Sequence, residues 1–187
     1  MNDDITNALN ILHEGGIILY PTDTIWGLGC DATNESAVHR IYSIKKREDT
    51  KSMIILVESA NRLFQYVKEI PEVTWQILDA AINPLTIIYP GAKNLAKNLI
   101  ADDNSIGIRI VNNEFCEKLI QRFKKPVVST SANISGEPSP KNFGQIKDII
   151  KEQVDYVVKW HQNDLSEKKP SGIIKLGIGG EIKIIRE

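Results

Sequence analysis

Apolar residues recur along the chain at two spacings, which predict helices and strands in alternation. A helical spacing runs from Ile5 to Leu12, and Gly15-Gly16 ends that helix. Short apolar runs bounded by Gly, Pro or Asn are typical of buried strands. Such runs occupy residues 17–20, 53–57, 85–89, 106–111 and 127–128. A closing pair of runs, 173–174 and 182–185, flanks residues 177–180 and predicts a hairpin.

Further helices are expected after residues that favour a helix start. The candidate starts are Asn34, Ser59, Pro71, Asn112 or Asn113, and Gln145, and the last helix is expected to reach Gln153. Pro71 is expected in the first turn of its helix, where its missing N–H costs nothing. Strands interleaved with amphipathic helices predict an α/β (α+β) fold, in which helices cover a mixed sheet. We expect one domain, residues 1–187.

Composition narrows the choice of function. The chain has 187 residues, 42% of them hydrophobic and 25% charged, which suits one soluble domain with a single core. Its net charge of −1 argues against an extended nucleic-acid-binding face, so any positive potential must be local. The longest apolar runs fall well short of the roughly 20 residues that cross a bilayer. Only two cysteines are present, and the N-terminus is acidic, so we expect a cytoplasmic protein.

The segment PTDTIWGLG, residues 21–29, follows the first predicted strand. It carries two hydroxyls, the Asp23 carboxylate and an aromatic ring into what we expect to be a glycine-rich loop. Ligands of α/β folds bind where strands end in loops. A turn in which Asp23 and the threonines bond their own backbone explains the same residues equally well. Gly27-x-Gly29 is not a dinucleotide fingerprint, because the third glycine and the helix are missing.

A basic run at a predicted helix end is the second candidate. Lys45, Lys46, Arg47 and Lys51 place four cations within seven residues, which would suit a triphosphate. Cations at a helix C-terminus are also stabilised by about 0.3–1 kcal/mol through the helix dipole. Taken alone, the run therefore favours a solvated helix end over a binding site.

The segment STSANISG, residues 129–136, is the third candidate. Hydroxyl and amide side chains directly after a buried strand suit phosphate oxygens or a ribose. The segment has more polar side chains than a capping turn needs, so we favour a functional role over a structural one. The spacing does not fit a GxSxG nucleophile elbow. The chain also contains no GxxxxGK[ST] loop and no HExxH zinc pattern.

Arg109 lies within the apolar run GIRI, where an arginine either points to solvent or is buried against a carboxylate. Thr86, in NPLT, and Ser171, which follows Pro170, are individually weaker candidates. Either would pass for an ordinary strand or turn residue without other evidence.

Taken in order, PTDTIWGLG, KKR with Lys51, NPLT, GIRI, STSANISG, PSGII and the final IIR resemble the YrdC domain family of TsaC-type threonylcarbamoyl-AMP synthases. The resemblance covers about residues 16–186. It implies a twisted mixed sheet around a concave cleft. It also implies that L-threonine, bicarbonate and ATP give threonylcarbamoyl-AMP and pyrophosphate, for threonylcarbamoyladenosine synthesis on tRNA.

The resemblance also assigns residues. The ATP site comprises Lys45, Arg47, Lys51, Ser131, Asn133 and Arg186, and the threonine site comprises Thr24, Arg109, Ser129 and Ser171. Lys45 and Arg47, from the family's Lys-x-Arg, also carry the catalytic role. Mg²⁺ is expected on the nucleotide, with no metal site on the protein, and tRNA or a tRNA-modifying protein is a possible partner.

The chain departs from the family at two places: Ser52 stands where Pro is usual, and Gly172 stands where Thr is usual. The second change removes a hydroxyl near the expected threonine pocket. The main alternative function is that of a YciO-like relative that binds nucleotide or RNA without strong synthase activity. Such relatives lack Lys-x-Arg and Ser-x-Asn, whereas this chain has both, so the synthase is favoured.

Overall fold

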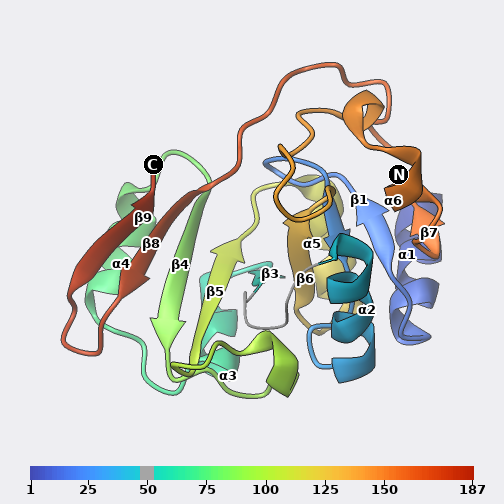
Figure 1. The fold of residues 1–187 in the computed structure, drawn as a ribbon. Coiled ribbons are helices and arrows are strands. Elements are labelled where there is room, and N and C mark those ends of the chain that lie inside the picture. The colour runs from blue at the N-terminus through green and yellow to red at the C-terminus, as the bar shows by residue number, and fades with distance from the viewer. Residues whose placement is uncertain (47–52) are drawn as a thin grey trace.

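A nine-stranded mixed sheet organises the described chain, in the order β7-β1-β2-β6-β3-β5-β4-β8-β9. The computed structural model describes residues 1–46 and 53–187 (Figure 1). The strands are β1 Ile18–Tyr20, β2 Gly27–Gly29, β3 Ile54–Val57, β4 Leu85–Pro90, β5 Ser105–Ile110, β6 Val127–Ser131, β7 Tyr156–Val157, β8 Gly172–Leu176 and β9 Ile182–Arg186. The sheet contains parallel pairs such as β3–β5 and antiparallel pairs such as β4–β5. The predicted α/β fold with a mixed sheet is confirmed.

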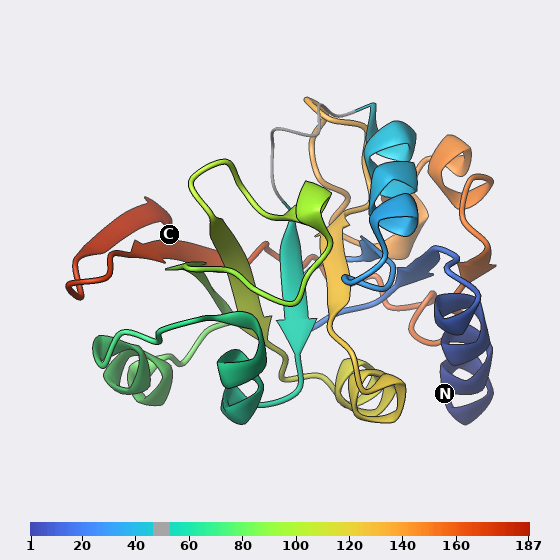
Figure 2. The ribbon, with the colours of Figure 1, turned by 90° about the horizontal axis from the view of Figure 1, so that it is seen from below.

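Helices cover both faces of this sheet, as Figure 2 shows. The α-helices are α1 Asn2–His13, α2 Glu35–Lys45, α3 Leu63–Tyr66, α4 Val73–Ala80, α5 Glu114–Phe123 and α6 Asp148–Lys151. Short 3-10 helices are η1 Ala60–Arg62, η2 Lys97–Leu99 and η3 Phe143–Gln145. Helices α1, α3, α4 and α5 lie along one face, and α2 lies on the other. None of the helices in the described part of the chain has the length and apolar character to cross a bilayer.

The buried core follows the predicted apolar positions. Phe115, Leu119 and Phe123 on α5 are all buried, and so are Ile18 to Tyr20 on β1. The two closing runs form the predicted antiparallel hairpin of β8 and β9. Burial of this apolar surface is the main term that stabilises the fold.

Residues 27–29, predicted to lie in a loop, instead form strand β2 between β1 and β6. The two glycines are there because neighbours approach closely. A Cβ on Gly29 would lie 2.5 Å from Cε1 of Tyr20 and 2.9 Å from the carbonyl oxygen of Val128. Contacts this short exclude any side chain, so Gly29 serves packing rather than a turn.

Three other boundaries differ from the sequence-based expectation. The helix expected over residues 145–153 is reduced to Asp148–Lys151, because Lys147 adopts an extended conformation before it. The helix expected to contain Pro71 in its first turn begins only at Val73. Strand β7, which was not predicted, is two residues long and pairs in parallel with β1. A strand this short leaves no readable periodicity.

After β7, the chain crosses the molecule to reach β8 at the opposite side of the sheet (Figure 1). This crossing segment, residues 158–171, is tied to the loop before η3. The amide of Lys168 donates to the carbonyl of Lys141, and the Lys141 ammonium pairs with the Glu167 carboxylate at 2.7 Å. The crossing therefore brings Pro170 and Ser171 over the ends of the central strands.

The start of α5 yields a stability prediction, because the sequence left two candidate caps. The Asn113 side chain accepts a hydrogen bond from the amide of Cys116, at 3.0 Å, and is the N-cap. Asn113→Ala should lower the free energy of unfolding by about 1 kcal/mol, since a helix N–H loses its acceptor. Urea denaturation measures this change. The exposed neighbour offers the matched control: Asn112→Ala should stay within about 0.5 kcal/mol of the parent. Equal losses in the two variants would contradict the cap assignment.

Candidate active site

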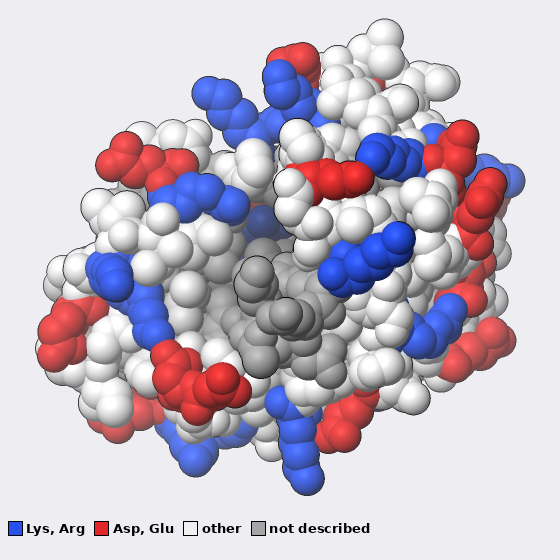
Figure 3. Space-filling view, in the orientation of Figure 1, with Lys and Arg blue, Asp and Glu red and all other residues white. Residues whose placement is uncertain are grey.

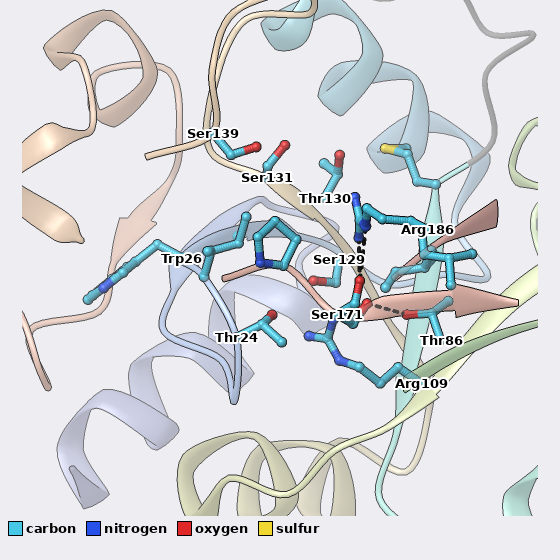
Figure 4. Close-up of a pocket in the computed structure, with 16 residues that line it drawn as sticks. Thr24, Trp26, Thr86, Arg109, Ser129, Thr130, Ser131, Ser139, Ser171 and Arg186 are labelled. Atoms are coloured by element: carbon cyan, nitrogen blue, oxygen red, sulfur yellow. Dashed lines mark hydrogen bonds between the residues drawn. The ribbon is translucent and has the colours of Figure 1, made fainter. Parts of the chain in front are cut away.

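One cavity of about 240 Å³ opens between the two halves of the sheet, beneath the crossing segment. Figure 4 shows its side chains converging from β3, β4, β5, β6, β8, β9 and the loops around them. Seven of its side chains carry hydroxyls: Thr24, Thr86, Ser129, Thr130, Ser131, Ser139 and Ser171. Arg109 and Arg186 add positive charge. Figure 3 shows the surrounding face hollowed near its centre, with basic and acidic side chains interspersed around it.

The turn at residues 21–25 presents Thr24 to this cavity. The buried hydroxyl of Thr22 holds the turn together: it donates to the carbonyl of Ile25, at 2.8 Å, and accepts from the amide of Thr24, at 3.1 Å. The Thr22 and Thr24 hydroxyl oxygens lie 3.0 Å apart. Thr22 therefore bonds the backbone of its own turn, as one interpretation predicted, and Thr24 lines a cavity, as the other predicted, whereas the Asp23 carboxylate accepts no hydrogen bond from the described backbone.

Arg109 is buried, with 3% of its surface exposed. Its Nη2 lies 3.0 Å from a carboxylate oxygen of Asp23 and donates to the Thr22 hydroxyl at 3.3 Å. Of the two alternatives that the sequence left open, burial against a carboxylate is the one found. A buried guanidinium needs such a partner because an uncompensated charge in the interior is strongly destabilising.

Ser171 and Arg186 form the opposite wall. The Ser171 hydroxyl lies 2.8 Å from the Thr86 hydroxyl, which brings together two residues whose individual signals were weak. Nε and Nη2 of Arg186 donate to the Ser171 carbonyl, at 3.0 and 2.8 Å. Partial burial and the nearby charge of Arg109 lower the pKa of Arg186. Among the described residues, the charged Arg186 side chain therefore contacts a neutral carbonyl.

Lys45 has an unexpected position for a residue in a basic run. Only 2% of its surface is exposed. Its Nζ donates to the carbonyls of Ser131 and Asn133, at 2.5 and 2.7 Å, and to Oδ1 of Asn133 at 3.3 Å. The Asn133 amide donates to the carbonyls of Ile134 and Glu137. Lys45 and Asn133 therefore brace the loop that carries Ser131 into the cavity, although neither lines it.

The predicted site residues are thus largely assembled. Thr24, Ser129 and Ser131 line the cavity with Arg109, Ser171 and Arg186, and Lys45 and Asn133 meet behind it. Arg47 and Lys51 lie outside the described residues. Gly172 lies outside the lining, and a Cβ there would point at Leu85, at 3.4 Å. Its departure from the family pattern therefore removes no hydroxyl from the cavity.

Sequence reasoning missed Ser139 and Pro170. Ser139 stands between two prolines just after the STSANISG segment, and a hydroxyl in so rigid a loop was the available signal.

Among the residues that the structure describes, no group of three His, Cys, Asp or Glu side chains is arranged to hold a metal ion.

A cleft of hydroxyls and arginines in a mixed α/β sheet defines a domain that binds small anionic ligands. The family model Sua5_yciO_yrdC, described as "Telomere recombination", matches residues 10–187. The chain belongs to this family.

Named relatives and solved structures agree with this family assignment. A protein of Pseudoalteromonas translucida named threonylcarbamoyl-AMP synthase is 37% identical over 82% of this chain and 84% of its own length. P. abyssi Sua5 complexed with L-threonine superposes with a TM-score of 0.82, at 28% identity over 92% of this chain and 50% of that one. E. coli YciO superposes with a TM-score of 0.85, at 26% identity over 100% of this chain and 90% of that one. The chain spans about half the length of the Sua5 protein.

The buried ammonium of Lys45 leads to a second stability prediction. Lys45→Met keeps the apolar stem but leaves the carbonyls of Ser131 and Asn133 without their charged donor. We expect the free energy of unfolding to fall by about 2–3 kcal/mol, measured by chemical denaturation. The exposed neighbour Lys46 is the control, and Lys46→Met should change stability by less than about 0.5 kcal/mol. A stable Lys45→Met protein would show that the loop needs no brace.

Proposed function

We propose that the chain is an L-threonylcarbamoyladenylate synthase, which makes threonylcarbamoyl-AMP and pyrophosphate from L-threonine, bicarbonate and ATP. The observation that carries the proposal is the convergence of seven hydroxyl side chains and two arginines on one cavity. Hydroxyls and guanidinium groups donate hydrogen bonds to the oxygens of carboxylates and phosphates. A curated relative of similar length, 37% identical, has this activity in its name.

L-Threonine would occupy the half of the cavity around Arg109. The guanidinium would bind the carboxylate of the amino acid, and Thr24, Ser129 and Ser171 would supply hydrogen bonds to its polar groups. P. abyssi Sua5, of the same fold, has been solved with L-threonine. Burial supports this assignment, because an ion pair that excludes water is worth more than an exposed one.

ATP would lie along the other side of the cavity, toward the Ser131 loop. Lys45 and Asn133 would hold this loop in place and, with Arg47, Lys51 and Arg186, complete the ATP site. A wider hollow of about 530 Å³ continues along the same face and shares Met53, Ile54, Thr86 and Ile173 with the first cavity. The two together offer the volume that nucleotide sites commonly have. Mg²⁺ would accompany the ATP phosphates as their counter-ion.

The reaction needs no covalent enzyme intermediate. The threonine amine adds to the carbon of bicarbonate, and loss of water leaves a carbamate. A carbamate oxygen then attacks the α-phosphorus of ATP in line, and pyrophosphate leaves. The contribution of the protein is to position the two substrates and to neutralise phosphate charge, which is where enzymes gain most in phosphate displacements.

A YciO-like role, binding nucleotide or RNA without strong synthase activity, is the alternative, since E. coli YciO has the same fold. The braced pair of Lys45 and Asn133 favours the synthase, because it uses one residue from each of the two patterns that such relatives lack. For the synthase we further propose a cytoplasmic location and transfer of the product to tRNA, directly or through a partner protein.

The purified chain should release pyrophosphate from ATP only when threonine and bicarbonate are both present. Labelled bicarbonate should appear in an adenylate separated by chromatography. Serine lacks the threonine methyl group, a difference worth about 10-fold or more in discrimination by an apolar contact, so its rate should be lower by that factor. Tight ATP binding without threonine-dependent pyrophosphate would instead establish the YciO-like role.

The sequence assigns Arg47 to the ATP phosphates, and a substitution at Arg47 tests this assignment. Loss of a charged hydrogen bond to phosphate costs about 1.5–3 kcal/mol, so Arg47→Ala should lower kcat/KM for ATP by roughly 10- to 100-fold. Arg40→Ala is the matched control, because Arg40 lies on α2 and pairs at the surface with Asp155, at 3.0 Å. Its kinetics should match the parent. Equal kinetics for the Arg47 and Arg40 variants would remove Arg47 from the ATP site.

A further inference from the structure

Asp23 is a buried carboxylate next to the cavity to which no role has yet been assigned. Its side chain is 4% exposed, as is that of its ion-pair partner Arg109. The two residues come from different parts of the fold, since Asp23 lies in the turn after β1 and Arg109 lies on β5. The ion pair therefore joins the turn that carries Thr24 to the strand at the centre of the cleft.

The polar groups of this pair are incompletely satisfied. Neither oxygen of the Asp23 carboxylate accepts a hydrogen bond from a described residue, so the 3.0 Å contact is an ion pair without the alignment of a hydrogen bond. Nε of Arg109 is buried and also has no hydrogen-bond partner among the described residues. Buried N–H groups are rarely left unpaired in proteins, because each one costs free energy. Nη1 of Arg109 also forms no hydrogen bond with a described residue, and because it is not among the buried unpaired atoms it is the donor that a ligand in the cavity can reach.

The turn holds the guanidinium at Nη2 and leaves Nη1 without a partner among the described residues. Nη2 contacts both the Asp23 carboxylate and the Thr22 hydroxyl. The Thr22 contact, at 3.3 Å, is long for a hydrogen bond, and the same hydroxyl already serves Ile25 and Thr24. Orientation of Arg109 therefore depends mainly on Asp23, and a guanidinium that is held at one end presents a fixed donor geometry to a planar carboxylate.

We propose that Asp23 is a positioning residue of the synthase: it fixes the Arg109 guanidinium at Nη2, so that Nη1, which has no hydrogen-bond partner among the described residues, meets the carboxylate of the amino-acid substrate. This inference rests on the proposed function. Asp23 touches no substrate itself. It sets the affinity for threonine through Arg109 and leaves the affinity for ATP unchanged.

Asp23→Asn tests the proposal, because it keeps the shape of the side chain and removes its charge. The affinity for L-threonine, measured by isothermal titration calorimetry, should fall by about 10-fold or more, as expected when a charge-assisted contact is lost. KM for threonine should rise by a similar factor, while KM for ATP should stay within about threefold of the parent value. A role in stability alone would lower the melting temperature without this difference between the two substrates.

Two further variants make the result interpretable. Asp23→Glu keeps the charge but displaces it, and the hollow of about 300 Å³ that Asp23 also lines has room for the extra methylene. Its affinity for threonine should lie between those of the parent and Asp23→Asn, and it decides the question if Asp23→Asn does not fold. Asp31→Asn is the matched control. It breaks the pair of the buried Asp31 carboxylate with the half-exposed Lys125, at 2.6 Å, outside the cavity lining, and should lower stability with threonine affinity unchanged.

Threonine affinity equal to that of the parent in both folded Asp23 variants overturns the inference, and so does tighter binding by Asp23→Asn. Absence of L-threonine binding by the parent protein overturns it as well. Calorimetry separates this inference from the proposed function. Selective loss of threonine binding in Asp23→Asn supports the role of Asp23 even if the parent releases no pyrophosphate.

Discussion

A guanidinium buried in the middle of a sheet must be compensated by whatever surrounds it, and the cleft of this protein is arranged around that requirement. Arg109 has 3% of its surface exposed and is compensated by Asp23 from the turn after β1. Removing one partner of a buried ion pair typically costs about 3–5 kcal/mol of stability. The Asp23–Arg109 pair therefore stabilises the packing of the turn against β5. The same contact fixes where Thr24 lies and which donors of Arg109 remain open.

Lys45 is a second buried cation, and different groups stabilise its charge. Its ammonium donates to the backbone carbonyls of Ser131 and Asn133 and to the amide oxygen of the Asn133 side chain. An ammonium has three donors that can diverge, which suits the gathering of carbonyls from a curved loop, whereas the planar guanidinium suits one carboxylate. The two buried cations therefore do different work: Arg109 remains available to a ligand, and Lys45 shapes the loop that presents Ser131.

Most of the fold could be predicted from the sequence because periodicity reports which side chains are buried. The core positions of α5, the strand around Arg109 and the closing hairpin all follow from it. The role of Lys45 could not be predicted, because its partners lie 86 and 88 residues away and a helix-end lysine is usually solvated. Strand β2 was missed since its glycines, typical of a turn, are required by the close approach of Tyr20. Most of the polar cavity residues were predicted from the order of segments, whereas Ser139 was missed and the Asp23 contact depends on the packing of the turn against β5.

The charge balance of the cleft explains how a chain with a net charge of −1 offers an anion site. Of the two arginines that line the cavity among the described residues, Arg109 has its charge offset by Asp23, and Arg186 faces the neutral carbonyl of Ser171. The lowered pKa of Arg186, which follows from partial burial and then from the charge of Arg109, is consistent with a wall that holds excess positive charge. An incoming anion relieves this excess at both groups, because it brings a counter-charge to Arg186 and an acceptor to Arg109. Without Asp23 the empty cleft would hold two uncompensated guanidinium groups, so the carboxylate that orients Arg109 also stabilises the unliganded state.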